Sequence, residues 1–189
     1  PSWSGDSHRP NVHFSMNSNT ISNCNINGGE AVIVLSEGKT NDIQNNSVYF
    51  DPKIEKGRAF HFFFHRGCVF KNNYITNAKY ESGCGVCFNK IGPGTTNLQI
   101  SDSTFSNCKG DAGGTFYLPE VDFDLVLTNL EFELCKNYYD TKSSDMISID
   151  FTIPSPKLEL RGCKFSYIES NSNGGSGIGL MANKLQELI

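Results

Sequence analysis

The nine residues Ile100–Cys108, with the sequence ISDSTFSNC, return at 127–135 as LTNLEFELC, 27 residues further along the chain. In both copies a turn-forming residue separates two large apolar residues that stand five positions apart. The second of these apolar residues, which we call the anchor, recurs at intervals of about 27 to 33 residues. The six anchors are Ile21, Val48, Ile75, Phe105, Phe132 and Phe165.

Each anchor is flanked in the same way. Five residues before the anchors stand Met16, Ile43, Phe70, Ile100, Leu127 and Leu160. Three residues before them stand Ser18, Asn45, Asn72, Asp102, Asn129 and Gly162. Asn, Asp and Gly tolerate the left-handed backbone angles that tight turns require. A polar or Gly-rich stretch and a second apolar run follow each anchor, so each unit is read as three short strands joined by a turn and a loop.

A repeat of this length is typical of a solenoid. One unit cannot bury its own apolar face, so the units must stack, with strands about 4.8 Å apart. The sequence therefore predicts an all-β fold, a single-stranded parallel β-helix of about six coils that forms one domain over residues 1–189. Residues 1–10 are expected to form a cap or extension, and residues 183–189 a cap or a continuation. The alternative is a β-sandwich, but its hairpins would not return the same features in one order.

Composition narrows the functional classes. The net charge is −4 and no basic stripe is present, so nucleic acid is not an expected partner. No apolar stretch reaches 18 residues, so no membrane span is expected.

The stretch 105–117, FSNCKGDAGGTFY, resembles the repeat of the polymorphic outer-membrane protein family, with its FxxN and GGA[ILV] motifs. Ile21–Cys24 followed by Gly28–Val32 forms a second copy. Phe70–Asn73 matches FxxN, and Asn173–Ile178 is a degenerate GG unit. The resemblance implies a right-handed β-helix of the pectate-lyase-like type, secreted or displayed at the cell surface, that serves adhesion or acts as a stalk. It brings no catalytic residues.

The chain has seven cysteines, and Cys24, Cys108 and Cys135 each follow an anchor by three residues. Cys108 and Cys135 are one coil apart, so their Cα atoms should lie within disulfide range. Parallel side chains suit a disulfide poorly, and a stack of free buried thiols is the favoured alternative. The CxxC at Cys84–Cys87 would place its thiols on opposite faces of a strand, which argues against a redox or zinc site.

The segment His61–His65, HFFFH, has the spacing of a helical metal site. On a strand its two histidines lie about 13 Å apart, too far for one metal. We expect Phe60, Phe62 and Phe64 to face inward and His61, Phe63 and His65 to face outward. The outward group would contact a partner or a sugar, stand as stray surface aromatics, or lie under a loop.

Two further features are candidates for contacts outside the core. Tyr138 and Tyr139 lie in the longest predicted loop, 136–145, and could contact a partner. Asn45 begins the sole N-glycosylation sequon, on a predicted turn. The Gly-rich stretch 174–179 lacks the Asp of a calcium repeat, and no cofactor or metal is expected.

The favoured function is a structural or adhesive module, extracellular or at the cell surface. It would be part of a longer chain or a unit that stacks end to end with copies of itself, with a glycan as a second candidate partner. The alternative is a polysaccharide lyase, a glycosidase or a carbohydrate-binding module. Such an enzyme needs carboxylates gathered on one outer face. Asp102, Glu131 and Arg161 lie one to two positions out of register, so an enzyme is the less favoured reading.

Overall fold

The structure is a computed structural model. It describes residues 13–24, 31–38, 40–54, 56–65, 67–80, 84–89, 97–110, 114–121, 123–137, 146–152, 157–170, 178–182 and 187–188. All pairs of strands within this part of the chain are parallel, and it contains no helix. The predicted fold class, an all-β parallel solenoid, is confirmed. Accordingly, none of the described residues forms a helix long and apolar enough to cross a membrane.

Two long sheets carry the predicted strands on either side of the first turn. The first sheet is β1 (His13–Asn17), β4 (Thr40–Gln44), β7 (Gly67–Lys71), β11 (Asn97–Ser101), β15 (Leu125–Thr128), β19 (Lys157–Arg161) and β23 (Glu187–Leu188). The second is β2 (Thr20–Cys24), β5 (Ser47–Phe50), β8 (Tyr74–Thr76), β12 (Thr104–Ser106), β16 (Glu131–Glu133) and β20 (Lys164–Ser166). Neighbouring strands within a sheet come from successive coils.

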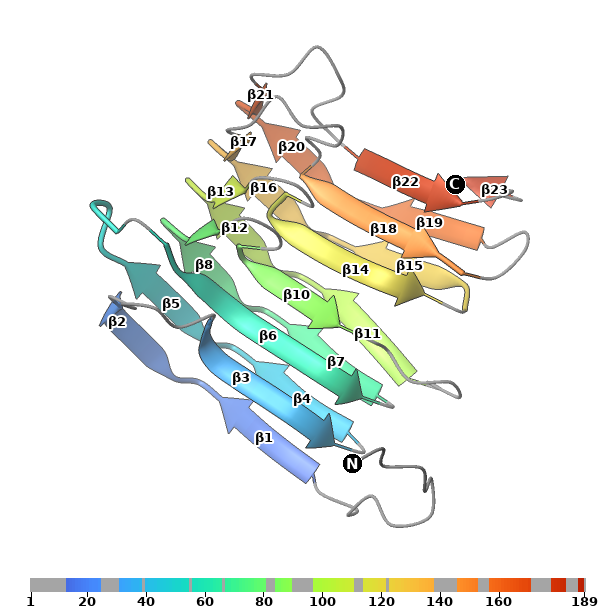
Figure 1. Cartoon of the computed structure of the whole chain (residues 1–189), viewed down its shortest axis with the longest axis horizontal. Helices are drawn as coiled ribbons and strands as arrows, with labels where there is room; N and C mark the ends of the chain where they lie inside the picture. The colour runs from blue at the N-terminus through green and yellow to red at the C-terminus, as the bar shows by residue number, and fades with distance from the viewer. Residues whose placement is uncertain are drawn as a thin grey trace, which may run out of the picture.

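Two more sheets close the coil. The third is β3 (Ala31–Gly38), β6 (Arg58–His65), β10 (Val86–Asn89), β14 (Phe116–Val121), β18 (Ile147–Phe151) and β22 (Ile178–Ala182). The fourth, of two-residue strands, is β9 (Lys79–Tyr80), β13 (Lys109–Gly110), β17 (Lys136–Asn137) and β21 (Glu169–Ser170). Figure 1 shows the coils following one another from β1 to β23, with these two strands at opposite ends of the stack.

The ends of the chain were predicted as caps or extensions. Residues 1–10 lie outside the described residues. Near the other end, β23 pairs in parallel with β19, and so adds a strand to the first sheet.

The strand register follows the predicted columns. Met16 pairs with Ile43, and the column continues through Phe70, Ile100, Leu127 and Leu160. The six anchors pair in the same way, from Ile21 to Phe165. The last three anchors stack their rings, with centroids 5.0 and 5.2 Å apart. Both predicted columns are therefore confirmed.

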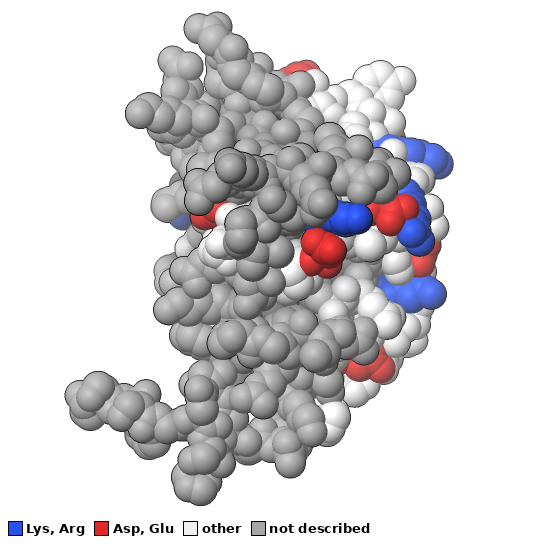
Figure 2. All heavy atoms as spheres, turned by 90° about the vertical axis from the view of Figure 1, so that its right-hand side faces the viewer, with Lys and Arg blue, Asp and Glu red and all other residues white. Residues whose placement is uncertain are grey.

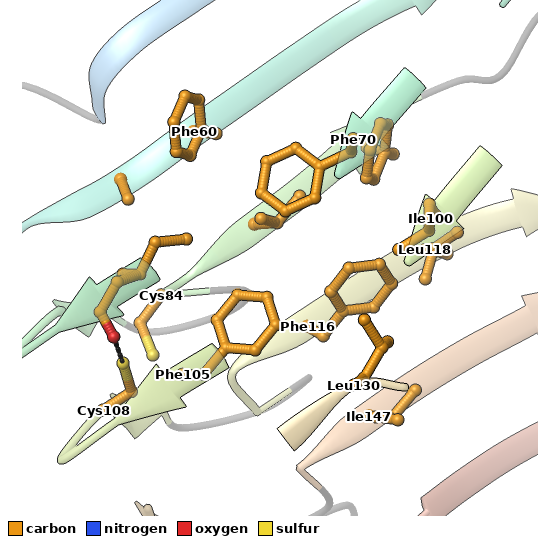
Figure 3. Packing of buried hydrophobic residues seen from close by; sticks show 14 of the residues in the cluster. Phe60, Phe70, Cys84, Ile100, Phe105, Cys108, Phe116, Leu118, Leu130 and Ile147 are labelled. Atoms are coloured by element: carbon orange, nitrogen blue, oxygen red, sulfur yellow. Dashed lines mark hydrogen bonds between the residues drawn. The ribbon is translucent and has the colours of Figure 1, made fainter. Parts of the chain in front are cut away.

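The core is a continuous apolar stack between the sheets, and Figure 3 shows its side chains converging from opposite strands. Phe60 and Phe62 of β6 are buried, as predicted, and Phe62 stacks on Phe88 of the next coil at 4.6 Å. Phe105 of the second sheet meets Phe116 of the third sheet edge-on at 6.0 Å. Aromatic pairs of this kind stabilise beyond the area they bury, by about 0.5–1.5 kcal/mol.

The predicted turn residues hold the bend between the first two sheets in the left-handed region. All six have φ between 51° and 62°. A second left-handed column lies at the bend between the second and fourth sheets, at Asn23, Asn77, Asn107, Leu134 and Tyr167. Asn107 donates from Nδ2 to Asn77 Oδ1 at 2.7 Å, so the predicted amide ladder is present in these coils. Leu134 and Tyr167 interrupt it, as expected.

A second amide ladder, buried one residue after the first turn, was not predicted. Asn46 and Asn73 are 1% and 2% exposed. Asn73 Oδ1 accepts hydrogen bonds from the backbone N–H and the Nδ2 of Asn46, both at 3.1 Å, and Asn73 Nδ2 donates to Ile43 O at 2.9 Å. Because water does not reach Asn46 and Asn73, their side chains must satisfy the buried backbone groups beside them.

We predict that Asn73→Ala lowers the free energy of unfolding by about 2–4 kcal/mol, because it leaves buried polar groups of two coils unsatisfied at about 1–3 kcal/mol each. Asn19→Ala is the matched control. Asn19 stands in the same column, and its Nδ2 donates to Asn46 Oδ1 at 3.0 Å and to Asn17 O at 3.1 Å, but it is exposed, so water can replace these side-chain bonds. Urea unfolding followed by circular dichroism measures both, and equal losses would contradict a role for burial.

We predict that Leu134→Asn raises the free energy of unfolding by about 0.5–1 kcal/mol. Leu134 has φ 54° and is 45% exposed, so it bears the left-handed cost with little burial to offset it, whereas Asn tolerates this backbone. Glu133→Asn, at the exposed neighbouring position outside the left-handed column, should give no increase. Urea midpoints at constant m-value measure the difference, and a less stable Leu134→Asn would refute the argument.

Candidate functional site

A cluster of buried thiols lies where the second, third and fourth sheets meet. Cys84, Cys108 and Cys135 are all 0% exposed, and the thiols of Cys84 and Cys135 lie close enough to that of Cys108 to affect its pKa. Cys108 Sγ lies 3.8 Å from Ile75 O, the contact dashed in Figure 3, and Cys135 Sγ lies 3.4 Å from Phe105 O. Burial, and then the two neighbouring thiols, raise the pKa of Cys108. The Cys108 thiol is therefore a neutral packing group rather than a nucleophile.

All seven cysteines are free thiols, which agrees with the favoured reading of the cysteine column. The strand pairing of Cys24 differs from the register that the repeat predicts. A shift after Ile21 aligns Cys24 with Phe50, and the residue predicted to align with it, Asp51, is exposed. The reason is that Phe50 takes the inward place, where it is 2% exposed.

The participation of Cys84 in this cluster was missed. Cys84 precedes β10 and stands outside the column that the repeat defines. Gly85 places it there, because a Cβ at Gly85 would lie 2.6 Å from the ring of Phe105. Only glycine lets the backbone pass so close to the anchor. The glycine beside an apolar run was the one signal available in the sequence.

His61 is buried rather than exposed. Its ring is 3% exposed, its Nδ1 lies 2.8 Å from Nη1 of Arg58, and it packs on Phe63 at 3.9 Å. The guanidinium of Arg58 in turn covers the ring of Tyr80 at 4.2 Å. His61 was expected to be exposed, but among the described residues Arg58 and Phe63 of its own strand cover it, rather than a loop. Arg58 was missed because a single arginine at the start of a strand carries no periodic signal.

Four other residues were predicted to contact a partner, namely Phe63, His65, Tyr138 and Tyr139. Phe63 is half-buried. The side chain of His65, at the end of β6, lies outside the description, as do Tyr138 and Tyr139. Their roles stay predictions.

Asn45, the predicted glycosylation residue, is exposed at the left-handed turn. Its Oδ1 accepts a hydrogen bond from Nδ2 of Asn72 at 3.2 Å. A glycan on Nδ2 of Asn45 would leave this bond in place. The geometry is compatible with modification, which stays a prediction.

Asp102, a candidate catalytic carboxylate, is held in a structural network. It accepts hydrogen bonds from Asn129 Nδ2 and Ser101 Oγ, both at 2.8 Å, and lies 3.7 Å from Lys71 Nζ. The bond from Asn129, first, and then that from Ser101, lower the pKa of Asp102. A glycosidase acid needs a raised pKa, so this carboxyl is unsuited to that role.

The other two candidates lie on different elements. Glu131 begins β16 in the second sheet, whereas Arg161 ends β19 in the first and pairs with Glu159 of its own strand at 2.5 Å. The hydrogen bond from Arg161 lowers the pKa of Glu159. Figure 2 shows acidic and basic side chains interspersed over the described part of one face, with no patch of either sign.

Within the described ranges, no group of three or more His, Cys, Asp or Glu side chains is arranged to hold a metal ion. Comparison of the chain with protein-family models, curated proteins and solved structures found no match. The site residues must therefore be interpreted from their own geometry.

We predict that a thiol reagent such as iodoacetamide labels Cys24 and Cys163 of the native protein first, since both are only partly buried. Burial raises the pKa of both, so at pH 8 they should react more slowly than free cysteine and accelerate as the pH rises. The other five should react only after unfolding. Peptide mass spectrometry measures the order, and native labelling of Cys108 before Cys163 would contradict it.

Proposed function

We propose that this chain is a structural or adhesive β-solenoid module, located outside the cell or at its surface, which associates end to end with copies of itself. The proposal rests on one observation, the solvent exposure of the core columns at the two ends of the described stack. Their inner members are fully buried, whereas their terminal members remain partly accessible.

At the first coil, Phe14 of β1 is 37% exposed and Met16 is only partly buried, whereas Ile43, the next member of the Met16 column, is 0% exposed. At the other end, Leu160 and Phe165 are partly buried. Burying such side chains fully contributes about 1.5–3 kcal/mol each. A second copy would supply that burial by continuing the same columns.

The strand edges support the same arrangement. β1, β2 and β3 each lie at the end of their sheet in the described structure. A parallel edge strand offers unpaired backbone groups to another chain. Since the two ends of a parallel stack differ, the contact would be heterologous, and such contacts extend into open filaments unless a rotation closes them.

The outer faces favour a structural role over an enzymatic one. Asp102 and Glu159 are engaged by neighbouring side chains, and their lowered pKa values oppose use as a general acid. Surface location is also part of the proposal, and rests on the resemblance of 105–117 to the repeat of the polymorphic outer-membrane protein family.

We predict that the protein self-associates in sedimentation velocity as its concentration rises, and that Phe14→Lys weakens this association at least about tenfold, because it places a charge in the apolar end contact. Val126→Lys is the matched control. Val126 is 39% exposed on β15 in the middle of the first sheet, away from both ends, so its substitution should leave association unchanged.

A wild-type protein that stays monomeric, or equal effects of the two substitutions, would overturn end-to-end association. Turnover of any member of a panel of polysaccharides, abolished by Asp102→Ala, would instead establish the enzymatic alternative.

A further inference from the structure

The outer face of the second sheet carries an uncharged surface of hydroxyl-bearing side chains. Successive side chains of a strand point to opposite faces, so the residues on either side of each buried anchor point outward. The strands β5, β8 and β12 lie side by side in the stack (Figure 1). Their outward residues, which we call the hydroxyl face, are Ser47, Tyr49, Tyr74, Thr76, Thr104 and Ser106.

Strand register gathers the hydroxyl face into two rows that run across the strands. The first row is Ser47, Tyr74 and Thr104, and the second is Tyr49, Thr76 and Ser106. Neighbouring strands lie about 4.8 Å apart. A ligand lying along the rows therefore meets a hydroxyl-bearing side chain on each of three successive coils.

Two tyrosines form the aromatic part of the hydroxyl face. Tyr49 is 38% exposed and Tyr74 36% exposed, and their ring centroids lie 5.7 Å apart with 45° between the ring planes. A tyrosine ring is apolar with a polar hydroxyl at its end, so it can cover the C–H face of a sugar and bond to its edge. The distance between the rings is comparable with the length of one pyranose unit, so the two rings can contact neighbouring sugars of a chain.

The serine and threonine side chains supply the hydrogen bonds that a sugar requires. A hydroxyl donates one hydrogen bond and accepts others, as a sugar hydroxyl does, so the two match in either direction. Protein interfaces differ from this composition, because they are enriched in Met and Arg besides aromatic residues and are depleted of Ser. The hydroxyl face therefore fits a glycan better than a protein partner.

Charge decides which class of glycan fits. The two rows continue from Thr104 and Ser106 into Glu131 and Glu133 of β16, and Glu133 is exposed. Charged side chains in these rows thus begin at the fifth coil, and those nearest the hydroxyl face are acidic. They would repel the carboxylate or sulfate groups of an anionic glycan. We infer that the hydroxyl face binds a neutral polysaccharide, with its sugar rings against Tyr49 and Tyr74.

This inference deepens the adhesive part of the proposed function, on which it rests, by naming the class of ligand. It does not depend on end-to-end association. The hydroxyl face is formed within one copy, by the second, third and fourth coils, so a protein that stays monomeric could still bind a polysaccharide there.

Affinity electrophoresis through gels that contain a β-glucan, a galactomannan or a xylan tests the inference. The protein is produced in bacteria, so that Asn45 carries no glycan. At least one of these neutral polysaccharides should retard the wild type. Tyr49→Ala and Tyr74→Ala should each raise the dissociation constant at least about tenfold, because each removes a stacking ring. Tyr74→Phe keeps the ring and should bind nearly as the wild type does.

Tyr167→Ala is the matched control, because Tyr167 is 78% exposed at a bend outside the hydroxyl face. It should bind as the wild type does, and so should Phe14→Lys. Retardation of a protein that stays monomeric would support the hydroxyl face even though it overturns end-to-end association. A carboxymethylated form of the polysaccharide that binds best should bind more weakly, because Glu133 borders the face.

Three results would overturn the inference: no retardation by any of the three polysaccharides, equal weakening by Tyr74→Ala and Tyr167→Ala, or tighter binding of the carboxymethylated form. Loss of self-association in Tyr74→Ala, without binding of a polysaccharide by the wild type, would assign the hydroxyl face to a second copy of the chain instead.

Discussion

The structure depends on satisfying the backbone of a tight bend that repeats at every coil. The chain must turn within a few residues beside a dry apolar core, so polar groups on the inner side of the bend, at Asn46 and Asn73, have no access to water. A residue with left-handed backbone makes the turn, and the side chain of the next residue, Asn46 or Asn73, hydrogen-bonds to buried backbone groups. Asn73 accepts two hydrogen bonds from Asn46 of the previous coil and donates one to Ile43. The side chains of Asn46, Asn73 and Ser103 thus each accept a backbone N–H of the preceding coil, and the coils are stable only as a stack.

In the stacked coils, Cys108, Cys135 and His61 are buried and take part in packing. Cys108 and Cys135 occupy an inward column, where burial keeps the Cys108 thiol neutral and both sulfurs contact backbone carbonyls. His61 occupies the opposite side of its strand, yet Arg58 and Phe63 cover it. Residue types that carry chemistry on a loop or a helix serve packing here.

The periodic features were predictable from the sequence because they express the period itself. The two apolar columns and the six left-handed turn residues, from Ser18 to Gly162, follow from spacing and residue type. What could not be predicted depends on local departures from the period. The register shift that aligns Cys24 with Phe50, and the close passage of Gly85 past Phe105 that brings in Cys84, are decided by three-dimensional packing.

The fold constrains the residue type least at outward positions, and the residues at these positions differ from coil to coil. The bend column is amide-bearing at Asn77 and Asn107, then becomes Leu134 and Tyr167, which are 45% and 78% exposed. Neither replacement relieves the left-handed backbone, so the fold alone does not account for them. The neighbouring column changes in parallel, from lysines to Glu169. The core columns stay apolar along the stack while the bend changes from amides to exposed apolar and aromatic side chains, so the coils differ from one another in chemistry along this outer edge.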